Sequence, residues 1–202
     1  MQIALIRHLP PVIAAGVCYG RSDLAARQPS RAELEAIRIR VARLRAPRLL
    51  SSPAKRCRML AAPLGAALGI APVFDERLLE LDFGAWDGVR WDDVDRAALD
   101  VWAADPAGFA PPGGEPVVAL IARIAAFAQD LRASDRDAIV VSHGGPLRLL
   151  GPMLRGEAVD WRTPPPGFGS LTLLSLQPAN AASTLSTTHS ATCSAAPSTS
   201  PV

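Results

Sequence analysis

The chain begins with Met1-Gln-Ile-Ala-Leu-Ile-Arg-His8, a short apolar run that ends on a cation and an imidazole. Apolar residues at consecutive positions indicate a strand buried on both faces, as in a parallel sheet. In open α/β sheets, functional groups gather where strands end at their carboxyl side. Arg7 and His8 at such an edge suit an anionic ligand, although a single histidine is more often an ordinary loop residue.

A second stretch repeats this arrangement. The apolar run Ala138-Ile-Val-Val141 ends on Ser142-His143-Gly-Gly145. Further short strands are predicted at 48–50, 71–74 and 170–176, and helices at 30–44, 53–69, 91–102, 117–131 and 146–154. Strands that alternate with helices predict an α/β fold, a three-layer α/β/α sandwich with a largely parallel central sheet.

Two helix starts are marked in the sequence. Ser30, followed three residues later by Glu33, predicts an N-cap with a capping box. Ser52 before Pro53 predicts a second N-cap with proline in the first helical position. Arg56 would then lie in a first helical turn, where the helix dipole disfavours a cation. That placement makes sense if an anion shares the site.

Composition limits the classes of function. The 202 residues carry 21 Lys and Arg against 19 Asp and Glu, which gives no reason to expect a nucleic-acid or membrane partner. There is no run of about 18 apolar residues and no signal-peptide pattern, so we expect a cytoplasmic protein. The three cysteines lack metal-ligand spacing. Oligomeric state is left open, with a homodimer among the options.

The chain divides into two regions by composition. Residues 1–177 contain all the predicted strands and helices and are expected to form one domain. Residues 178–202 are almost entirely Ala, Ser, Thr and Pro, without a charged side chain, and predict a disordered tail.

Four blocks in this order resemble the histidine phosphatase (phosphoglycerate mutase-like) superfamily. They are Leu-Ile-Arg7-His8, Ser51-Ser-Pro-Ala-Lys-Arg56, Leu79-Glu-Leu-Asp-Phe-Gly-Ala-Trp-Asp-Gly88 and Val-Val-Ser-His143-Gly-Gly. The resemblance covers about residues 1–176. The short loop at 17–23 and the small size are most similar to the α-ribazole phosphatase branch of the superfamily.

The resemblance implies a mechanism and a set of catalytic residues. His8 would be the nucleophile that forms a phosphohistidine. Arg7, Arg56 and His143 would bind the phosphoryl oxygens and offset their charge in the transition state. Glu80 would act first as general acid and then as general base. The resemblance implies neither a metal nor another cofactor.

The sequence indicates the roles of four other residues less clearly. Arg21 and Ser22 are predicted to contact substrate, but they could equally form a simple turn. Trp86 is expected to pack beneath the Glu80 loop rather than to stack on substrate. Leu9 stands where the family usually has glycine, which leaves the phosphate contacts open because glycine allows closer backbone approach.

The expected activity is therefore metal-independent hydrolysis of a small phosphorylated metabolite through phosphohistidine, with α-ribazole 5′-phosphate as a candidate. Two alternatives stay open. A phosphoglycerate mutase-type phosphotransferase would need more cations and longer covering loops. A catalytically silent phosphate-binding protein would retain the pocket but form no phosphohistidine.

Overall fold

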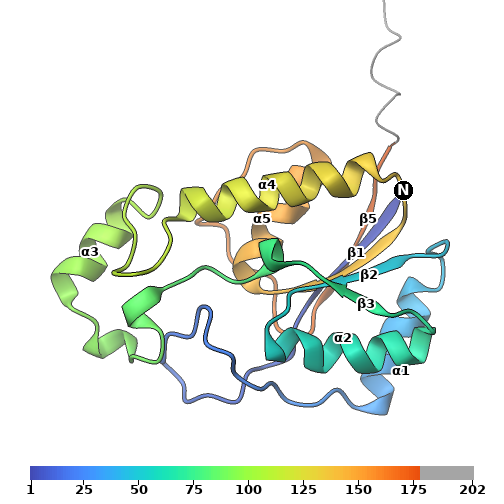
Figure 1. Ribbon diagram of the computed structural model, residues 1–202, viewed down its shortest axis with the longest axis horizontal. Helices are drawn as coiled ribbons and strands as arrows, with labels where there is room; N and C mark the ends of the chain where they lie inside the picture. Colours follow the sequence, from blue (N-terminus) through green and yellow to red (C-terminus); the bar gives the residue numbers. More distant parts are fainter. Residues whose placement is uncertain (178–202) are drawn as a thin grey trace, which may run out of the picture.

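The computed structural model of the chain describes residues 1–177 (Figure 1). The predicted disorder of residues 178–202 lies outside the described residues. At the centre is a five-stranded sheet with the order β3-β2-β4-β1-β5. The four strands β3, β2, β4 and β1 are parallel to their neighbours, and β5 is antiparallel to β1. The strands are β1 (Gln2–Arg7), β2 (Arg48–Ser51), β3 (Pro72–Phe74), β4 (Ala138–Ser142) and β5 (Leu171–Ser175).

Helices cover both faces of this sheet, α1 and α2 on one and α4 and α5 on the other (Figure 1). The helices are α1 (Arg31–Val41), α2 (Lys55–Leu68), α3 (Arg96–Ala104), α4 (Val117–Ala133) and α5 (Gly144–Arg155). The structure thus confirms the predicted three-layer α/β/α sandwich with a largely parallel sheet.

Strand β1 explains why both faces need helices. Its side chains alternate between the two apolar cores: Ala4 and Ile6 pack with α1 and α2, and Ile3 and Leu5 pack with α4 and α5. All four are at most 5% exposed. Successive side chains of a strand point to opposite faces, so a continuous apolar run requires a cover on each side.

One of the two predicted helix starts is confirmed. Ser30 caps α1, accepting a hydrogen bond from the backbone N–H of Glu33, and the Glu33 side chain completes the capping box. The prediction for Ser52 and Pro53 was wrong, because α2 begins at Lys55 after an Ala54 cap. The hydroxyl of Ser52 instead lies 2.8 Å from a ring nitrogen of His143. The same oxygen also accepts from the N–H of Ala54 over 3.3 Å, so it binds a distant ring and the backbone that precedes the helix.

Between β3 and α4 the chain forms three short 3-10 turns and α3, which lies away from the sheet (Figure 1). The turns are η1 (Glu76–Leu78), η2 (Gly84–Trp86) and η3 (Trp91–Asp93). The helix predicted at 91–102 is therefore split, since Asp95 caps a new helix by accepting from the N–H of Ala98. Trp86 is 6% exposed and packs against other aromatic rings, as expected.

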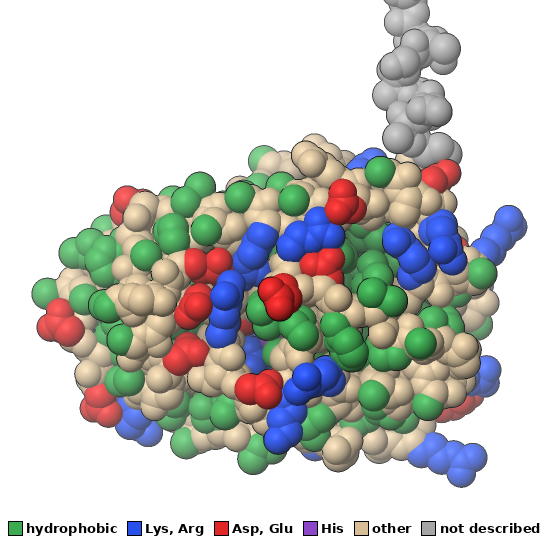
Figure 2. Space-filling model, viewed as in Figure 1, with side chains coloured by type: hydrophobic (Ala, Val, Ile, Leu, Met, Phe, Trp, Pro, Cys, Tyr) green, Lys and Arg blue, Asp and Glu red, His purple; other side chains and the backbone are tan. Residues whose placement is uncertain are grey.

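Charged side chains of both signs are interspersed over the face drawn in Figure 2. Such mixing produces no extended field of one sign on this face. Within residues 1–177, no helix combines the length and the apolar character needed to span a membrane.

Candidate active site

Strand register brings the two histidines together. Strands β1 and β4 are parallel neighbours, and Arg7 pairs with Ser142 at their carboxyl ends. His8 and His143 are the next residues on each strand, and their ring centroids lie 5.1 Å apart. The backbone N–H of His8 donates to the carbonyl of Ser142 over 3.0 Å, which holds the two chains in place just beyond the ladder.

The hydrogen bonding of His8 defines its tautomer. Nδ1 lies 2.7 Å from the carbonyl oxygen of Leu9. A carbonyl oxygen can only accept, so Nδ1 carries the ring proton, and Nε2 of the neutral ring keeps its lone pair. An imidazole in this state has a nucleophilic nitrogen without first having to lose a proton.

Burial and nearby cations keep His8 neutral. Its side chain is 1% exposed, and the pKa of His8 is lowered from 6.5 to about 3 by burial and by the charges of Arg56 and Arg7. Burial, followed by the charge of Arg56, also lowers the pKa of His143 well below its ordinary value. Both rings are therefore uncharged at neutral pH.

This lowering predicts a loss of folding stability at acid pH. Between pH 6.5 and about 3 the unfolded chain binds a proton at His8 more readily than the folded chain does, so the free energy of unfolding falls as the pH is lowered through this interval. Urea denaturation at pH 7, 5 and 4 should show the fall. We expect a shallower fall in His8→Asn, which lacks the titrating ring, and an equal fall in both proteins would contradict the assignment to His8.

His143 and Arg56 are joined by a hydrogen bond. The Nε of Arg56 donates to Nδ1 of His143 over 3.1 Å, and Nε2 of His143 lies 2.8 Å from the Ser52 hydroxyl. The terminal nitrogens of Arg56 donate to the carbonyls of Gly20 and Ser22 over 2.6 and 2.7 Å. Both side chains are 0% exposed. Their direct contact with a phosphoryl group stays a prediction, because these atoms bind protein groups here.

Glu80 reaches the same edge from the loop after η1. Its carboxylate accepts from the N–H of Leu81 over 3.0 Å and from the N–H of Gly145 over 3.2 Å. A Cβ atom at position 145 would lie 2.2 Å from Oε1 of Glu80. Glycine thus leaves room for the carboxylate to meet the N-terminus of α5, where the helix dipole favours negative charge.

Arg123 of α4 holds the backbone of the segment that carries Glu80. Its terminal nitrogens donate to the carbonyls of Arg77, Leu79 and Glu80 over 2.6, 2.5 and 2.9 Å. The same guanidinium lies 2.6 Å from the carboxylate of Glu115, and both side chains are about 15% exposed. Sequence reasoning missed this residue, since a single arginine in an amphipathic helix carries no local signal.

We expect Arg123→Met to lower the free energy of unfolding by about 2 kcal/mol, because three carbonyls lose their donor and the Glu115 carboxylate keeps only the more exposed Arg21, 3.4 Å away, as its cationic partner. Loss of the three carbonyl contacts should also displace Glu80 and lower kcat about ten-fold with little change in KM. Urea denaturation and steady-state kinetics measure the two effects. Arg96→Met is the control, because Arg96 is 83% exposed and should change stability by less than about 0.5 kcal/mol. An effect on KM alone would contradict a positioning role.

Arg21 and Ser22 face acidic groups. The guanidinium of Arg21 lies 3.5 Å from the carboxylate of Asp82 and 3.4 Å from that of Glu115. The hydroxyl and N–H of Ser22 both donate to one carboxylate oxygen of Asp87, over 3.0 and 2.8 Å. These contacts order the loop, and substrate contact by either residue stays a prediction.

Leu9 fits its position without strain. Its side chain is 6% exposed, and its carbonyl orients His8. Within residues 1–177, the non-glycine residues with positive φ are Ala46 and Asp135, so Leu9 does not need glycine's conformational freedom. The backbone carbonyl that sets the His8 tautomer is available from any residue.

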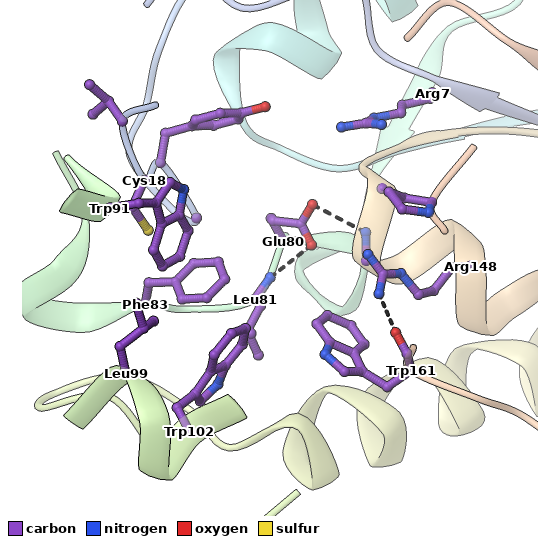
Figure 3. A pocket seen from close by; sticks show the side chains of 16 residues that line it. Arg7, Cys18, Glu80, Leu81, Phe83, Trp91, Leu99, Trp102, Arg148 and Trp161 are labelled. Carbon is purple, nitrogen blue, oxygen red and sulfur yellow. Dashed lines mark hydrogen bonds between the residues drawn. The ribbon is translucent and has the colours of Figure 1, made fainter. Parts of the chain in front are cut away.

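A cavity of about 410 Å³ opens beside this edge (Figure 3). Arg7, Glu80 and Arg148 line it together with Gly144 and Gly145 of α5, whereas the deeply buried His8 does not. It is also lined by Val17, Cys18, Tyr19, Gly20, Leu81, Phe83, Trp91, Leu99, Trp102, Trp161 and Pro165. The predicted residues Arg7 and Glu80 therefore share one cavity.

Two arginines contribute the positive charge of the cavity. Arg7 donates to the carbonyl of Pro166 over 2.7 Å and lies 3.8 Å from the ring centre of Phe168. Arg148 hydrogen-bonds the carbonyl of Trp161 and lies 4.2 Å from the centre of its ring. Burial lowers the pKa of both guanidinium groups. Arg148 was missed in the sequence, although it follows Gly144 by one helical turn and thus shares its face of α5.

Among the residues that the structure describes, no cluster of three or more His, Cys, Asp or Glu side chains is arranged to hold a metal ion. The free thiols of Cys18 and Cys57 are buried, and burial raises the pKa of each to about 12.

Several known proteins that are similar in sequence to this chain are named phosphatases. A phosphoserine phosphatase from Hydrogenobacter thermophilus is 27% identical over 107 residues, covering 50% of this chain and 51% of that protein. A glucosyl-3-phosphoglycerate phosphatase from Mycolicibacterium vanbaalenii is 33% identical over 123 residues, 55% of each chain. The chain thus spans about half the length of these curated relatives.

Solved structures match over more of the chain. A mycobacterial glucosyl-3-phosphoglycerate phosphatase superposes with a TM-score of 0.71 at 27% identity, covering 85% of this chain and 88% of that one. The α-ribazole phosphatase from Shigella flexneri has a TM-score of 0.76 at 20% identity, covering 88% and 91%, and thus shares the fold. The family model described as histidine phosphatase superfamily (branch 1) matches residues 3–186. Together with the paired histidines at the strand ends, this match shows that the chain belongs to the histidine phosphatase superfamily.

Proposed function

We propose that this protein is a phosphatase that hydrolyses phosphate monoesters through a phosphohistidine on Nε2 of His8. The observation that carries the proposal is the state of His8: a neutral ring whose Nδ1 proton is bound by the Leu9 carbonyl, so that Nε2 has a free lone pair. Arg7 and Glu80 at the same sheet edge supply a cation for the phosphate and a carboxyl group for proton transfer. These are the three functions that the reaction needs.

The reaction proceeds in two displacements. Nε2 of His8 attacks phosphorus, the N–P bond forms, and the P–O bond to the alcohol breaks while Glu80 donates a proton to the leaving oxygen. Water then attacks phosphorus and gives a proton to Glu80, the N–P bond breaks, and inorganic phosphate leaves. Arg7 offsets the charge on the phosphoryl oxygens in both steps.

In the proposed complex Arg56 binds a phosphoryl oxygen while it holds the loop at Gly20 to Ser22. The fully buried guanidinium donates to two carbonyls of this loop. The guanidinium has five N–H donors, of which three bind His143 and these two carbonyls, so two terminal N–H groups remain for a phosphoryl oxygen beside His8. His143 keeps its bond to Arg56 and orients this side chain.

The substrate is a small phosphorylated metabolite, and α-ribazole 5′-phosphate is one candidate. This candidate is supported by the resemblance of residues 17–23 to the α-ribazole phosphatase branch and by the shared fold of the Shigella enzyme. The named relatives act on phosphoserine or glucosyl-3-phosphoglycerate, which makes these esters the natural competitors in a substrate panel.

The test is hydrolysis of p-nitrophenyl phosphate with EDTA present. Turnover that survives the chelator is expected, because arginines and histidines supply the groups in the proposed steps. Activity that is lost with EDTA and restored by a divalent metal would overturn the metal-independent mechanism. A protein that binds vanadate but shows no turnover would be a phosphate-binding protein instead, and preferred transfer between phosphoglycerates would make it a mutase.

A further inference from the structure

The cavity changes in chemical character along its length. Figure 3 shows Arg7 and Arg148 on one side and a group of aromatic side chains on the other, with Glu80 between them. In the proposed reaction Glu80 protonates the oxygen that joins phosphate to the alcohol. If the phosphate lies at Arg7, the alcohol part extends past Glu80 toward the aromatic side.

That aromatic side is built as a packed wall, formed by Phe83, Trp91 and Trp102. The ring centroids of Phe83 and Trp91 lie 5.4 Å apart in an edge-on arrangement, and those of Phe83 and Trp102 lie 5.9 Å apart. Trp91 and Trp102 are nearly parallel, with an angle of 22° between their planes. Rings that already hold one another in place lose little freedom when a further ring binds.

The same end of the cavity offers few partners to a polar ligand. Beside the three rings it is lined by Val17 and Leu99, whose side chains cannot form hydrogen bonds, and by Cys18, whose thiol is a weak donor. The indole N–H of Trp102 is buried and has no hydrogen-bond partner among the described residues. A serine, glycerate or sugar moiety placed there would give up water without receiving equivalent hydrogen bonds. The wall thus disfavours the polar alcohols that the relatives' names specify.

We propose that the substrate is the phosphate monoester of an alcohol that carries a planar aromatic group, and that this group packs against Phe83, Trp91 and Trp102. The inference rests on the proposed phosphatase function, because it places the phosphate at Arg7 and the leaving oxygen at Glu80. It adds the chemical class of the substrate and gives these three rings the role of selecting the alcohol part of the ester.

The test compares 2-phenylethyl phosphate with ethyl phosphate. Both esters release a primary alcohol, so the ring is the main difference between them. We expect kcat/KM to be about 10- to 100-fold higher for the phenylethyl ester, which is the range that an apolar pocket can provide. In Trp102→Leu this ratio should fall several-fold, mainly through a higher KM for the aromatic ester. Phe109→Leu is the matched control, since Phe109 packs on Trp86 behind the wall and does not line the cavity; it should keep the ratio.

A binding measurement separates this inference from the proposed function. Benzylphosphonate should bind at least about ten-fold tighter than methylphosphonate, whether or not the protein turns over. Absence of p-nitrophenyl phosphate hydrolysis would overturn the phosphatase proposal alone. Equal binding of the two phosphonates, equal kcat/KM for the two esters, or a preference for phosphoserine would overturn the aromatic substrate class.

Discussion

Replacement of His8 by alanine should lower kcat/KM for p-nitrophenyl phosphate by at least about 10⁴-fold, the order of loss seen when an enzyme loses its nucleophile. No covalent intermediate can form without Nε2 of this ring. After a brief reaction with ³²P-labelled substrate, wild-type protein should carry label that is lost in acid and retained in base, as expected for a phosphoramidate bond. His8→Ala should carry none.

Two further variants test whether the losses of activity and of label come from the missing imidazole of His8. His8→Asn retains a polar side chain at the buried position and should be as inactive as His8→Ala, so the loss does not reflect only a missing side chain. Cys57→Ser should keep the label, because Cys57 lies beside His143 and has a pKa raised to about 12, which keeps the thiol protonated. Label that survives in His8→Ala would place the nucleophile elsewhere.

Glu80→Gln should have an effect that depends on the leaving group. Glutamine cannot donate a proton as a carboxylic acid does, so hydrolysis of alkyl phosphates should fall about 10²- to 10⁴-fold. The p-nitrophenolate ion leaves without protonation, and the first displacement with that ester should be much less affected. Since the same residue activates water in the second step, phosphoenzyme should accumulate, and a burst of p-nitrophenolate should precede a slow steady state.

The control for this experiment is Glu76→Gln. Glu76 is an exposed carboxylate of η1, four residues before Glu80 on the same segment. Its replacement changes the charge equally and should leave both phases unaltered. Equal losses with alkyl and p-nitrophenyl esters in Glu80→Gln, without a burst, would show that Glu80 holds the site together and transfers no proton.

Much of the fold was predictable because its signals are local. The apolar runs before His8 and His143 predicted two buried strands, and the parallel register of β1 and β4 brings the two rings together as expected. The capping box at Ser30 was also confirmed. The start of α2 was mispredicted: the helix begins at Lys55, and the hydroxyl of Ser52 binds both the N–H of Ala54 and His143, which is 91 residues away in the chain.

Arg123 and the aromatic wall could not be predicted, because both depend on contacts between residues that are distant in the chain. Arg123 binds the carbonyl of Glu80 from 43 residues away, and nothing near either residue marks the pair. The aromatic wall was also missed, since Phe83, Trp91 and Trp102 come from the loop before η2, from η3 and from α3, and the packing of these segments has no sequence periodicity. Only the folded chain brings these side chains together.

By itself, the sequence determined the α/β architecture, the family, and which side chains stand at the strand ends, because apolar periodicity and short motifs depend on neighbours in the chain. The tertiary structure decided the chemical state of those side chains. Burial beside Arg56 lowers the pKa of His8, and the Leu9 carbonyl selects its tautomer. Desolvation and hydrogen-bond direction depend on every group packed around an atom, and these groups come from distant parts of the chain.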